Sequence, residues 1–225
     1  MTRAVFFDVD FTLIHPGPTF QGVGYREFCS RHGVGVEESA FEHAVAAASA
    51  LLDSGGGIYN PQLFITYTQR IIEGMGGSGP GVEAVAREIY AEWAACHHFS
   101  LYDDVADVLR DLHRAGLKIG LISNTQRCLS SFERHFELGG LFSVALSSFE
   151  HGYMKPHRSI FDAALKATGA RPEESVMVGD SYPHDIEGAL RAGMRAVLVC
   201  RSGRGSSSAA DVPVISSLRE LPPLL

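Results

Sequence analysis

Four short polar segments of this 225-residue chain carry the side chains that could do chemistry. They are DVDFT at 8–12, SNT at 123–125, KP at 155–156 and GDSYPHD at 179–185. Each comes at or shortly after the end of an apolar run (AVFF, KIGLI, SVALS or SVMV) that is typical of a buried strand. Ligands of an open α/β sheet bind beyond the carboxyl ends of its strands. We therefore expect one pocket that combines carboxylates, a lysine, a serine and backbone amides, which suits a divalent cation and a phosphate.

Two carboxylates, Asp8 and Asp10, stand where the first predicted strand ends and the chain turns, so that both can approach one centre. A carboxylate can attack phosphorus and form an aspartyl-phosphate. It is a poor nucleophile towards an anion unless a cation neutralises charge, and bound Mg²⁺ does this while it orients the phosphoryl group. Asp180 follows Gly179 at the end of another predicted strand, and we assign it as a metal ligand. Its hard oxygen atoms favour Mg²⁺ over zinc.

The other polar residues of these segments can bind the phosphate or orient their neighbours. Lys155 offers a compact positive charge to the phosphate and to the nucleophile. Ser123 can donate its hydroxyl and its backbone N–H to a phosphate oxygen, and a helix that starts after it would favour an anion. We predict that Asp185 plays an outer, orienting role towards the metal's water or Lys155. Adjoining residues complete the predicted site: Thr12 and Asn124 on the substrate side, and Ser181 beside Asp185.

The order of strand-like and helix-like patterns predicts the fold class. From residue 101 onward, helical periodicity alternates with short apolar strands, which indicates βαβ units and a parallel sheet. The stretch from 16 to 100 contains three helical patterns separated by glycine-rich breakers, and strand signals there are nearly absent. We predict an α/β protein whose Rossmann-like parallel sheet core is formed by residues 1–15 and 100–225. Residues 16–99 form an inserted all-α domain in this prediction.

Composition and charge exclude several classes of protein. The chain has 19 basic and 26 acidic residues and no basic run, so no nucleic acid partner is expected. No stretch reaches the roughly 18–20 apolar residues that span a membrane, and the N-terminus enters a strand without a cleavable leader. We expect a cytoplasmic protein without membrane contact, either a monomer or a homodimer. His97 and His98 are not predicted to bind a metal, because adjacent residues do not face each other on a helix.

The four segments resemble the sequence motifs of the haloacid dehalogenase superfamily. FFDVDFTLI is similar to the first motif, LISNT to the second, Lys155-Pro156 to the third and VGDSYPHD to the fourth. The resemblance covers the predicted core on both sides of the insertion. A helical insertion directly after the first motif resembles the C1 cap of that superfamily, and PGPTFQGVGY resembles its REG-2-like and HDHD3-like members.

This resemblance implies a role for each residue. Asp8 is then the nucleophile and Asp10 the general acid/base, with Lys155 as the catalytic lysine. Asp8, Asp10 and Asp180 would hold Mg²⁺, Asp10 through its backbone carbonyl. Ser123 and Lys155 would bind the phosphoryl group of the substrate.

Two features bear on substrate choice. Phe11 stands where phosphatases of this superfamily frequently have glycine, so its aromatic side chain must point away from the substrate. The loop from Asp53 to Asn60 contains glycines that allow close approach. Its contribution to specificity is a hypothesis, with a plain interhelical loop as the alternative.

The leading prediction is a Mg²⁺-dependent phosphatase that acts on a small phosphorylated metabolite through an aspartyl-phosphate intermediate. A 2-haloacid dehalogenase would use Asp8 to displace halide without a metal. Asp10 argues against it, because a leaving alkoxide requires an acid there and a leaving halide does not. A phosphomutase, which returns the phosphoryl group to a sugar, and a binding protein with vestigial chemistry are the remaining alternatives.

Overall fold

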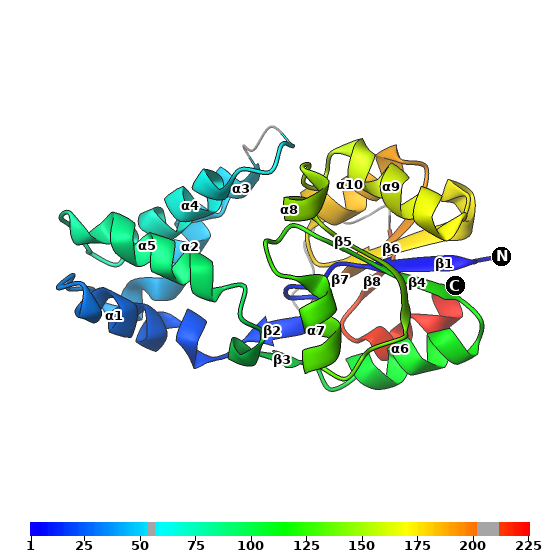
Figure 1. The fold of residues 1–225 in the computed structure, drawn as a ribbon, viewed down its shortest axis with the longest axis horizontal. Helices are drawn as coiled ribbons and strands as arrows, with labels where there is room; N and C mark the ends of the chain where they lie inside the picture. Colours follow the sequence, from blue (N-terminus) through cyan, green and yellow to red (C-terminus); the bar gives the residue numbers. More distant parts are fainter. Residues whose placement is uncertain (54–56, 202–211) are drawn as a thin grey trace. The chain divides into compact units, whose positions relative to one another are not determined.

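The computed structural model describes residues 1–53, 57–201 and 212–225. The chain forms two compact units, one of Met1–His15 with Leu101–Leu225 and the other of Pro16–Ser100. We call them the core unit and the helical unit (Figure 1). Part of the predicted specificity loop, residues 54–56, lies outside the described residues.

The core unit is built on a sheet of six strands whose paired neighbours are all parallel. In spatial order the strands are β5 (Phe142–Ser147), β4 (Lys118–Ser123), β1 (Ala4–Phe7), β6 (Ser175–Gly179), β7 (Arg195–Val199) and β8 (Val214–Ile215). The predicted α/β class with a parallel sheet is confirmed. β1 is central and all four of its residues are buried, as expected for a parallel strand covered on both faces.

Helices cover both faces of this sheet, with α9 and α10 on one face and α6 on the other (Figure 1). The helices of the core unit are α6 (Val105–Arg114), α7 (Leu129–His135), α8 (Ser148–His151), α9 (Arg158–Thr168) and α10 (Glu187–Arg191). Short turns accompany them: η4 (Pro172–Glu174), the π-helical η5 (Tyr182–Ile186), η6 (Leu218–Glu220) and η7 (Pro222–Leu224).

Apolar side chains of β1 pack directly against the helices on the α9 face. Phe6 belongs to a buried cluster with Phe161 of α9 and Met177 of β6. Gly120 of β4 leaves room for Phe6, because a Cβ there would come within 2.6 Å of its ring. This packing fixes the central strands, and with them the strand ends that carry the predicted site.

The helical unit contains α1 (Gly22–Arg31), α2 (Phe41–Ala48), α3 (Ala50–Asp53), α4 (Pro61–Gly74) and α5 (Gly81–Glu92), with turns η1 (Pro18–Phe20), η2 (Glu38–Ala40) and η3 (Cys96–His98). The first of the three predicted helical patterns covers residues 37–52, and the structure interrupts it at Ser49, between α2 and α3. Asn60 caps α4 by accepting a hydrogen bond from the Gln62 N–H, with Pro61 at the first helical position. No helix within the described ranges is long and apolar enough to cross a membrane.

One strand pairing is absent from the sequence prediction. The short strands β2 (Ile14–Pro16) and β3 (Phe99–Leu101) pair with each other in a two-stranded sheet. Each has only three residues and partly polar character, so neither has enough alternation to predict a strand. Their formation depends on pairing between segments that are far apart in the sequence.

Candidate active site

The candidate site lies at the carboxyl ends of three neighbouring strands of the core unit. Asp8 follows β1, Ser123 is the last residue of β4, and Asp180 follows β6. β1 lies between β4 and β6 in the sheet. The Asp8 N–H donates to the Val178 carbonyl at 2.9 Å, so the hydrogen bonds between β1 and β6 extend to the backbone of Asp8. The sheet therefore brings together three polar residues from distant parts of the sequence.

The Lys155 ammonium joins two carboxylates in the buried part of the site. Its Nζ lies 2.5 Å from Asp8 Oδ1 and 2.6 Å from Asp185 Oδ1. Asn124 holds the backbone of this lysine: its Oδ1 accepts from the Lys155 N–H at 2.7 Å, and its Nδ2 donates to the Lys155 carbonyl at 2.9 Å. The Lys155-Pro156 peptide bond is cis. Asn124, predicted on the substrate side, thus positions Lys155 in this structure.

Three carboxylates gather around this lysine. Asp8, Asp180 and Asp185 each offer an oxygen, and these atoms lie within 4.8 Å of one another. Thr12 Oγ1 donates to Asp180 Oδ1 at 3.3 Å, so Thr12 contacts a predicted metal ligand. Carboxylate oxygens are the donors that Mg²⁺ prefers. The donor set therefore fits the predicted magnesium ion. The Asp185 carboxylate lies close enough to Asp8 and Asp180 to be a metal ligand itself, although we predicted that it only orients the metal's water or Lys155.

Burial and mutual repulsion shift the protonation of this cluster. Burial raises the pKa of Asp8 to about 6, although the Lys155 charge opposes the shift, and Asp185 adds to it. The pKa of Asp180 also rises well above its ordinary value, because of burial and the charges of Asp8 and Asp185. Burial acts to lower the pKa of Lys155, but Asp185 and Asp8 outweigh it and raise that pKa. One ammonium thus balances only part of the negative charge, and a divalent cation would balance the rest.

The GDSYPHD segment folds back so that Asp185 lies directly under the end of β6. A Cβ on Gly179 would lie 2.2 Å from Asp185 Oδ2, so only glycine fits there. Asp185 Oδ2 accepts from the Ser181 N–H at 3.0 Å, and Ser181 Oγ accepts from the His184 N–H at 3.4 Å. Ser181 therefore stabilises the turn that presents Asp185 to Lys155.

Ser123 carries a buried hydroxyl that no described residue bonds. Leaving a buried polar group unpaired costs roughly 1–3 kcal/mol, so a hydrogen bond from this hydroxyl to a ligand would be favourable. The helix that follows Ser123, predicted at residues 128–137, is α7, and it begins only at Leu129. The segment between them consists mainly of bends. A phosphate at Ser123 would thus bind the hydroxyl and local amides without an adjoining helix N-terminus.

Arg127 is a site residue that the sequence analysis missed. It is 1% exposed, and its Nη1 lies 2.9 and 3.1 Å from the two carboxylate oxygens of Asp10. Burial raises the pKa of Asp10, Arg127 opposes this rise, and Asp8 adds to it. A lone arginine in a loop is usually exposed, so its position in the sequence carried no signal. The Asp10 side chain is thereby directed to Arg127.

Phe11 adopts a backbone conformation that normally favours glycine. Its φ angle is 64°, in the left-handed region, and the residue is 44% exposed. The turn after β1 requires this angle, since the Phe11 N–H returns to the Ile14 carbonyl at 2.7 Å. The position therefore has the backbone geometry of a glycine although it carries an aromatic ring.

The shifted pKa of Asp8 has a consequence for stability without metal. A rise from 3.8 to about 6 corresponds to roughly 3 kcal/mol. Because the folded state binds this proton more tightly, the contribution is present below about pH 4 and is lost as the pH rises through 6. In EDTA, the free energy of unfolding of the wild type should therefore fall relative to that of Asp8→Asn, by on the order of 2 kcal/mol, between about pH 4.5 and 7.5. Urea unfolding of both proteins measures the difference, and parallel pH curves would contradict it.

Known proteins match this chain along most of its length. The family model of haloacid dehalogenase-like hydrolases matches residues 2–193. The glyceraldehyde 3-phosphate phosphatase of Methanothermobacter thermautotrophicus is 29% identical over 240 residues, with 100% of both chains covered. Haloacid dehalogenase-like hydrolase domain-containing protein 3 of Homo sapiens is 29% identical over 213 residues, covering 88% of this chain and 81% of that one. The solved structure of the HAD-hydrolase YfnB from Bacillus subtilis, bound to magnesium, has a TM-score of 0.79 at 16% identity and covers 100% of this chain and 98% of that chain.

The likeness to the solved structure shows a shared fold. The family match includes all four segments that build the site. The resemblance stated from the sequence, including that to HDHD3-like members, is confirmed. The chain belongs to the haloacid dehalogenase-like hydrolase family and is an enzyme of that family.

Proposed function

We propose that this hydrolase is a Mg²⁺-dependent phosphatase that hydrolyses a small phosphorylated metabolite through an aspartyl-phosphate on Asp8. The observation that carries the proposal is the buried Asp8 carboxylate, which Lys155 holds within a cluster of three carboxylates. Ser123 is the last residue of the neighbouring strand β4, and its hydroxyl, which no described residue bonds, is available to a phosphate oxygen. Together these groups offer a nucleophile, a cation site and a hydrogen-bond donor for the phosphate at one edge of the sheet.

In the first step, a carboxylate oxygen of Asp8 attacks phosphorus while the bond from phosphorus to the leaving oxygen breaks. Asp10 donates a proton to that oxygen, which then leaves as an alcohol. Lys155 holds Asp8 through its Oδ1 and offsets negative charge. Bound Mg²⁺ would supply further neutralisation of charge on the phosphoryl oxygens.

In the second step, water attacks the phosphorus of the aspartyl-phosphate and releases inorganic phosphate and free Asp8. Asp10, now ionised, takes a proton from that water, which returns it to the form that began the cycle. Ser123 donates a hydrogen bond to a phosphoryl oxygen in both steps. The pairing of Asp10 with Arg127 favours the ionised form that this second step needs.

The relatives support this reaction class and the size of the substrate. The archaeal relative is named for hydrolysis of glyceraldehyde 3-phosphate, and a Thermus thermophilus relative that is 34% identical over 155 residues is named a phosphoserine phosphatase. Both named substrates are small phosphate monoesters. We therefore propose the same class for this chain, without nucleic acid as a substrate.

Phosphate release from an aryl phosphate should require Mg²⁺. Wild-type protein with p-nitrophenyl phosphate should release phosphate when Mg²⁺ is present, and EDTA should abolish turnover because the carboxylate cluster is then uncompensated. Re-addition of Mg²⁺ should restore it, which a release assay with and without chelator measures.

A panel of phosphorylated metabolites then identifies the preferred substrate. Chloride release from 2-chloropropionate without metal, together with no phosphate release from any ester, would replace the proposal with a dehalogenase. Transfer of the phosphoryl group to a sugar in preference to water would replace it with a phosphomutase.

A further inference from the structure

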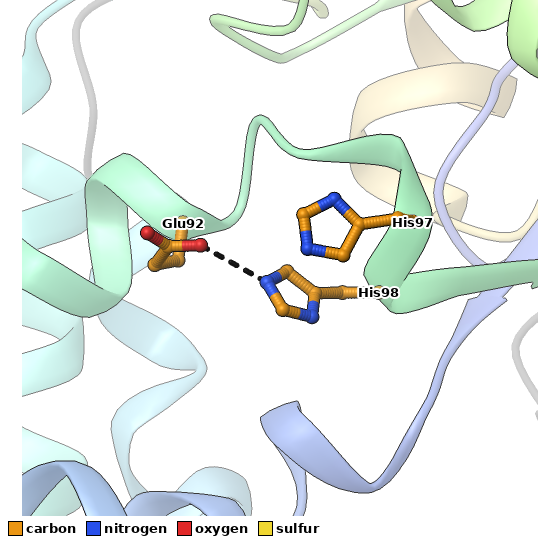
Figure 2. A group of neighbouring side chains, drawn as sticks. All are labelled: Glu92, His97 and His98. Atoms are coloured by element: carbon orange, nitrogen blue, oxygen red, sulfur yellow. Dashed lines mark hydrogen bonds and ion pairs between the residues drawn. The ribbon is translucent and has the colours of Figure 1, made fainter.

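The helical unit contains a second cluster of metal-binding side chains, chemically different from the carboxylate cluster. Glu92 ends α5, and His97 and His98 lie in η3. Each offers one ligand atom, and these atoms all lie within 4.8 Å of one another. Figure 2 shows both imidazole rings extending from η3 towards Glu92. We propose that these three residues form a binding site for a transition-metal ion of the Zn²⁺ class.

The geometry overturns the reason for discounting this histidine pair. Adjacent residues point in different directions on a helix, yet the ring centroids of His97 and His98 in the short turn η3 are only 4.0 Å apart. His98 Nε2 and Glu92 Oε2 are 3.0 Å apart and share a hydrogen bond. Ligand atoms around one tetrahedral Zn²⁺ are about 3.3–3.5 Å apart. The His98–Glu92 pair is thus already close to this spacing, and the His97 ligand atom lies within 4.8 Å of both.

The backbone between the ligands is already held in place. The Ala95 N–H donates to the Glu92 carbonyl at 2.9 Å, and the His98 N–H donates to the Ala95 carbonyl at 3.3 Å. Gly17 fixes the other side of the turn, because its N–H donates to the His98 carbonyl at 2.7 Å and a Cβ there would lie only 3.0 Å from that oxygen. Because the turn is formed before binding, little conformational entropy is lost when the ion binds.

Aromatic packing supports the same turn. The Phe20 ring lies 4.6 Å from Trp93 and 5.3 Å from His98, and the Trp93 ring lies 5.1 Å from Phe99. The His98 side chain is 18% exposed, whereas that of Glu92 is 44% exposed. The packed side restrains His98, and the open side leaves room for water as a fourth ligand.

The donor set selects the class of metal. Two imidazoles and one carboxylate suit Zn²⁺, Co²⁺, Ni²⁺ or Cu²⁺, whereas Mg²⁺ prefers oxygen donors in octahedral geometry. The two clusters should therefore bind different ions. This inference is independent of the proposed phosphatase reaction, because none of its three residues belongs to the core unit.

Titration with Co²⁺ tests the site, since its visible absorption reports the ligands around the ion. Untagged full-length Asp180→Asn protein in excess Mg²⁺ is used as the parent, so that the carboxylate cluster does not compete. We expect one Co²⁺ per chain, displaced by Zn²⁺. Adding His97→Asn should weaken binding by at least about tenfold, since even loss of an outer partner costs roughly that much at known sites. Adding His43→Asn, which removes an exposed imidazole from α2, should leave the affinity unchanged.

A second variant, Glu92→Gln, keeps the test valid if His97→Asn fails to fold. Glu92→Gln should weaken Co²⁺ binding in the same way, and circular dichroism confirms that each variant is folded. The melting temperature supplies a second readout: Zn²⁺ should raise it in the parent and in His43→Asn but not in His97→Asn. No saturable binding by the parent, or equal affinity in the parent, His97→Asn and Glu92→Gln, would overturn the proposal.

Discussion

Replacing Asp8 with asparagine should lower kcat for phosphate release by at least about 10⁴-fold, a loss of the size that follows removal of a covalent nucleophile. Asparagine has almost the same shape as aspartate, but its amide does not attack phosphorus. Lys155 retains its partner Asp185 at 2.6 Å, so the variant should fold. Steady-state kinetics with an aryl phosphate in Mg²⁺ gives the loss, and circular dichroism checks the fold.

A matched substitution separates this effect from the loss of any carboxylate. Asp162 of α9 pairs with Arg158 on the surface of the same unit, with the Asp162 side chain 50% exposed. Asp162→Asn should leave kcat within about twofold of the wild type, since surface substitutions rarely have large effects. Near-normal turnover by Asp8→Asn would show that another residue is the nucleophile, and the aspartyl-phosphate pathway would be abandoned.

Much of the site could be predicted because its residues follow strands that the sequence marks clearly. AVFF, IGLI and SVMV are buried in parallel strands, and Asp8, Ser123 and Asp180 lie at the ends of these strands. The carboxyl ends of parallel strands lie at one edge of a sheet, so strand order alone brings these side chains together. The fold class and the convergence of the segments therefore followed from local patterns.

Contacts that depend on the path of a loop could not be predicted in this way. Arg127 lies two residues beyond the SNT segment, and its burial against Asp10 follows from the bends of the segment before α7. Likewise, the ring centroids of His97 and His98 lie 4.0 Å apart although the two residues are adjacent in the 3-10 turn η3. Hydrophobic periodicity predicts which residues form helices and strands. It does not predict the contacts of residues in turns and loops, which depend on the path of the backbone there.

Replacing Asp10 with asparagine should lower kcat by about 10²- to 10⁴-fold for an alkyl phosphate, because the leaving alkoxide then receives no proton. For an aryl phosphate the loss in the first step should be smaller, since a phenolate leaves without a general acid. The asparagine carbonyl can still accept from Arg127 Nη1, which lies 2.9 Å from Asp10 Oδ1, so the local structure should persist. The ratio of the two first-step losses is measured by comparing kcat/KM for matched alkyl and aryl esters, since kcat/KM reports the steps up to formation of the aspartyl-phosphate.

The second step gives Asp10→Asn a distinct kinetic signature. If Asp10 also accepts the proton of the attacking water, its loss slows hydrolysis of the aspartyl-phosphate more than its formation from an aryl ester. Rapid mixing should then show a burst of about one phenol per chain, followed by slow turnover. Arg127→Lys keeps a charge beside Asp10 but loses the planar fork, so it should cost less than Asp10→Asn and should lower kcat more than it changes KM. Equal losses for both esters, without a burst, would show that Asp10 acts by binding alone and that the general acid/base assignment is wrong.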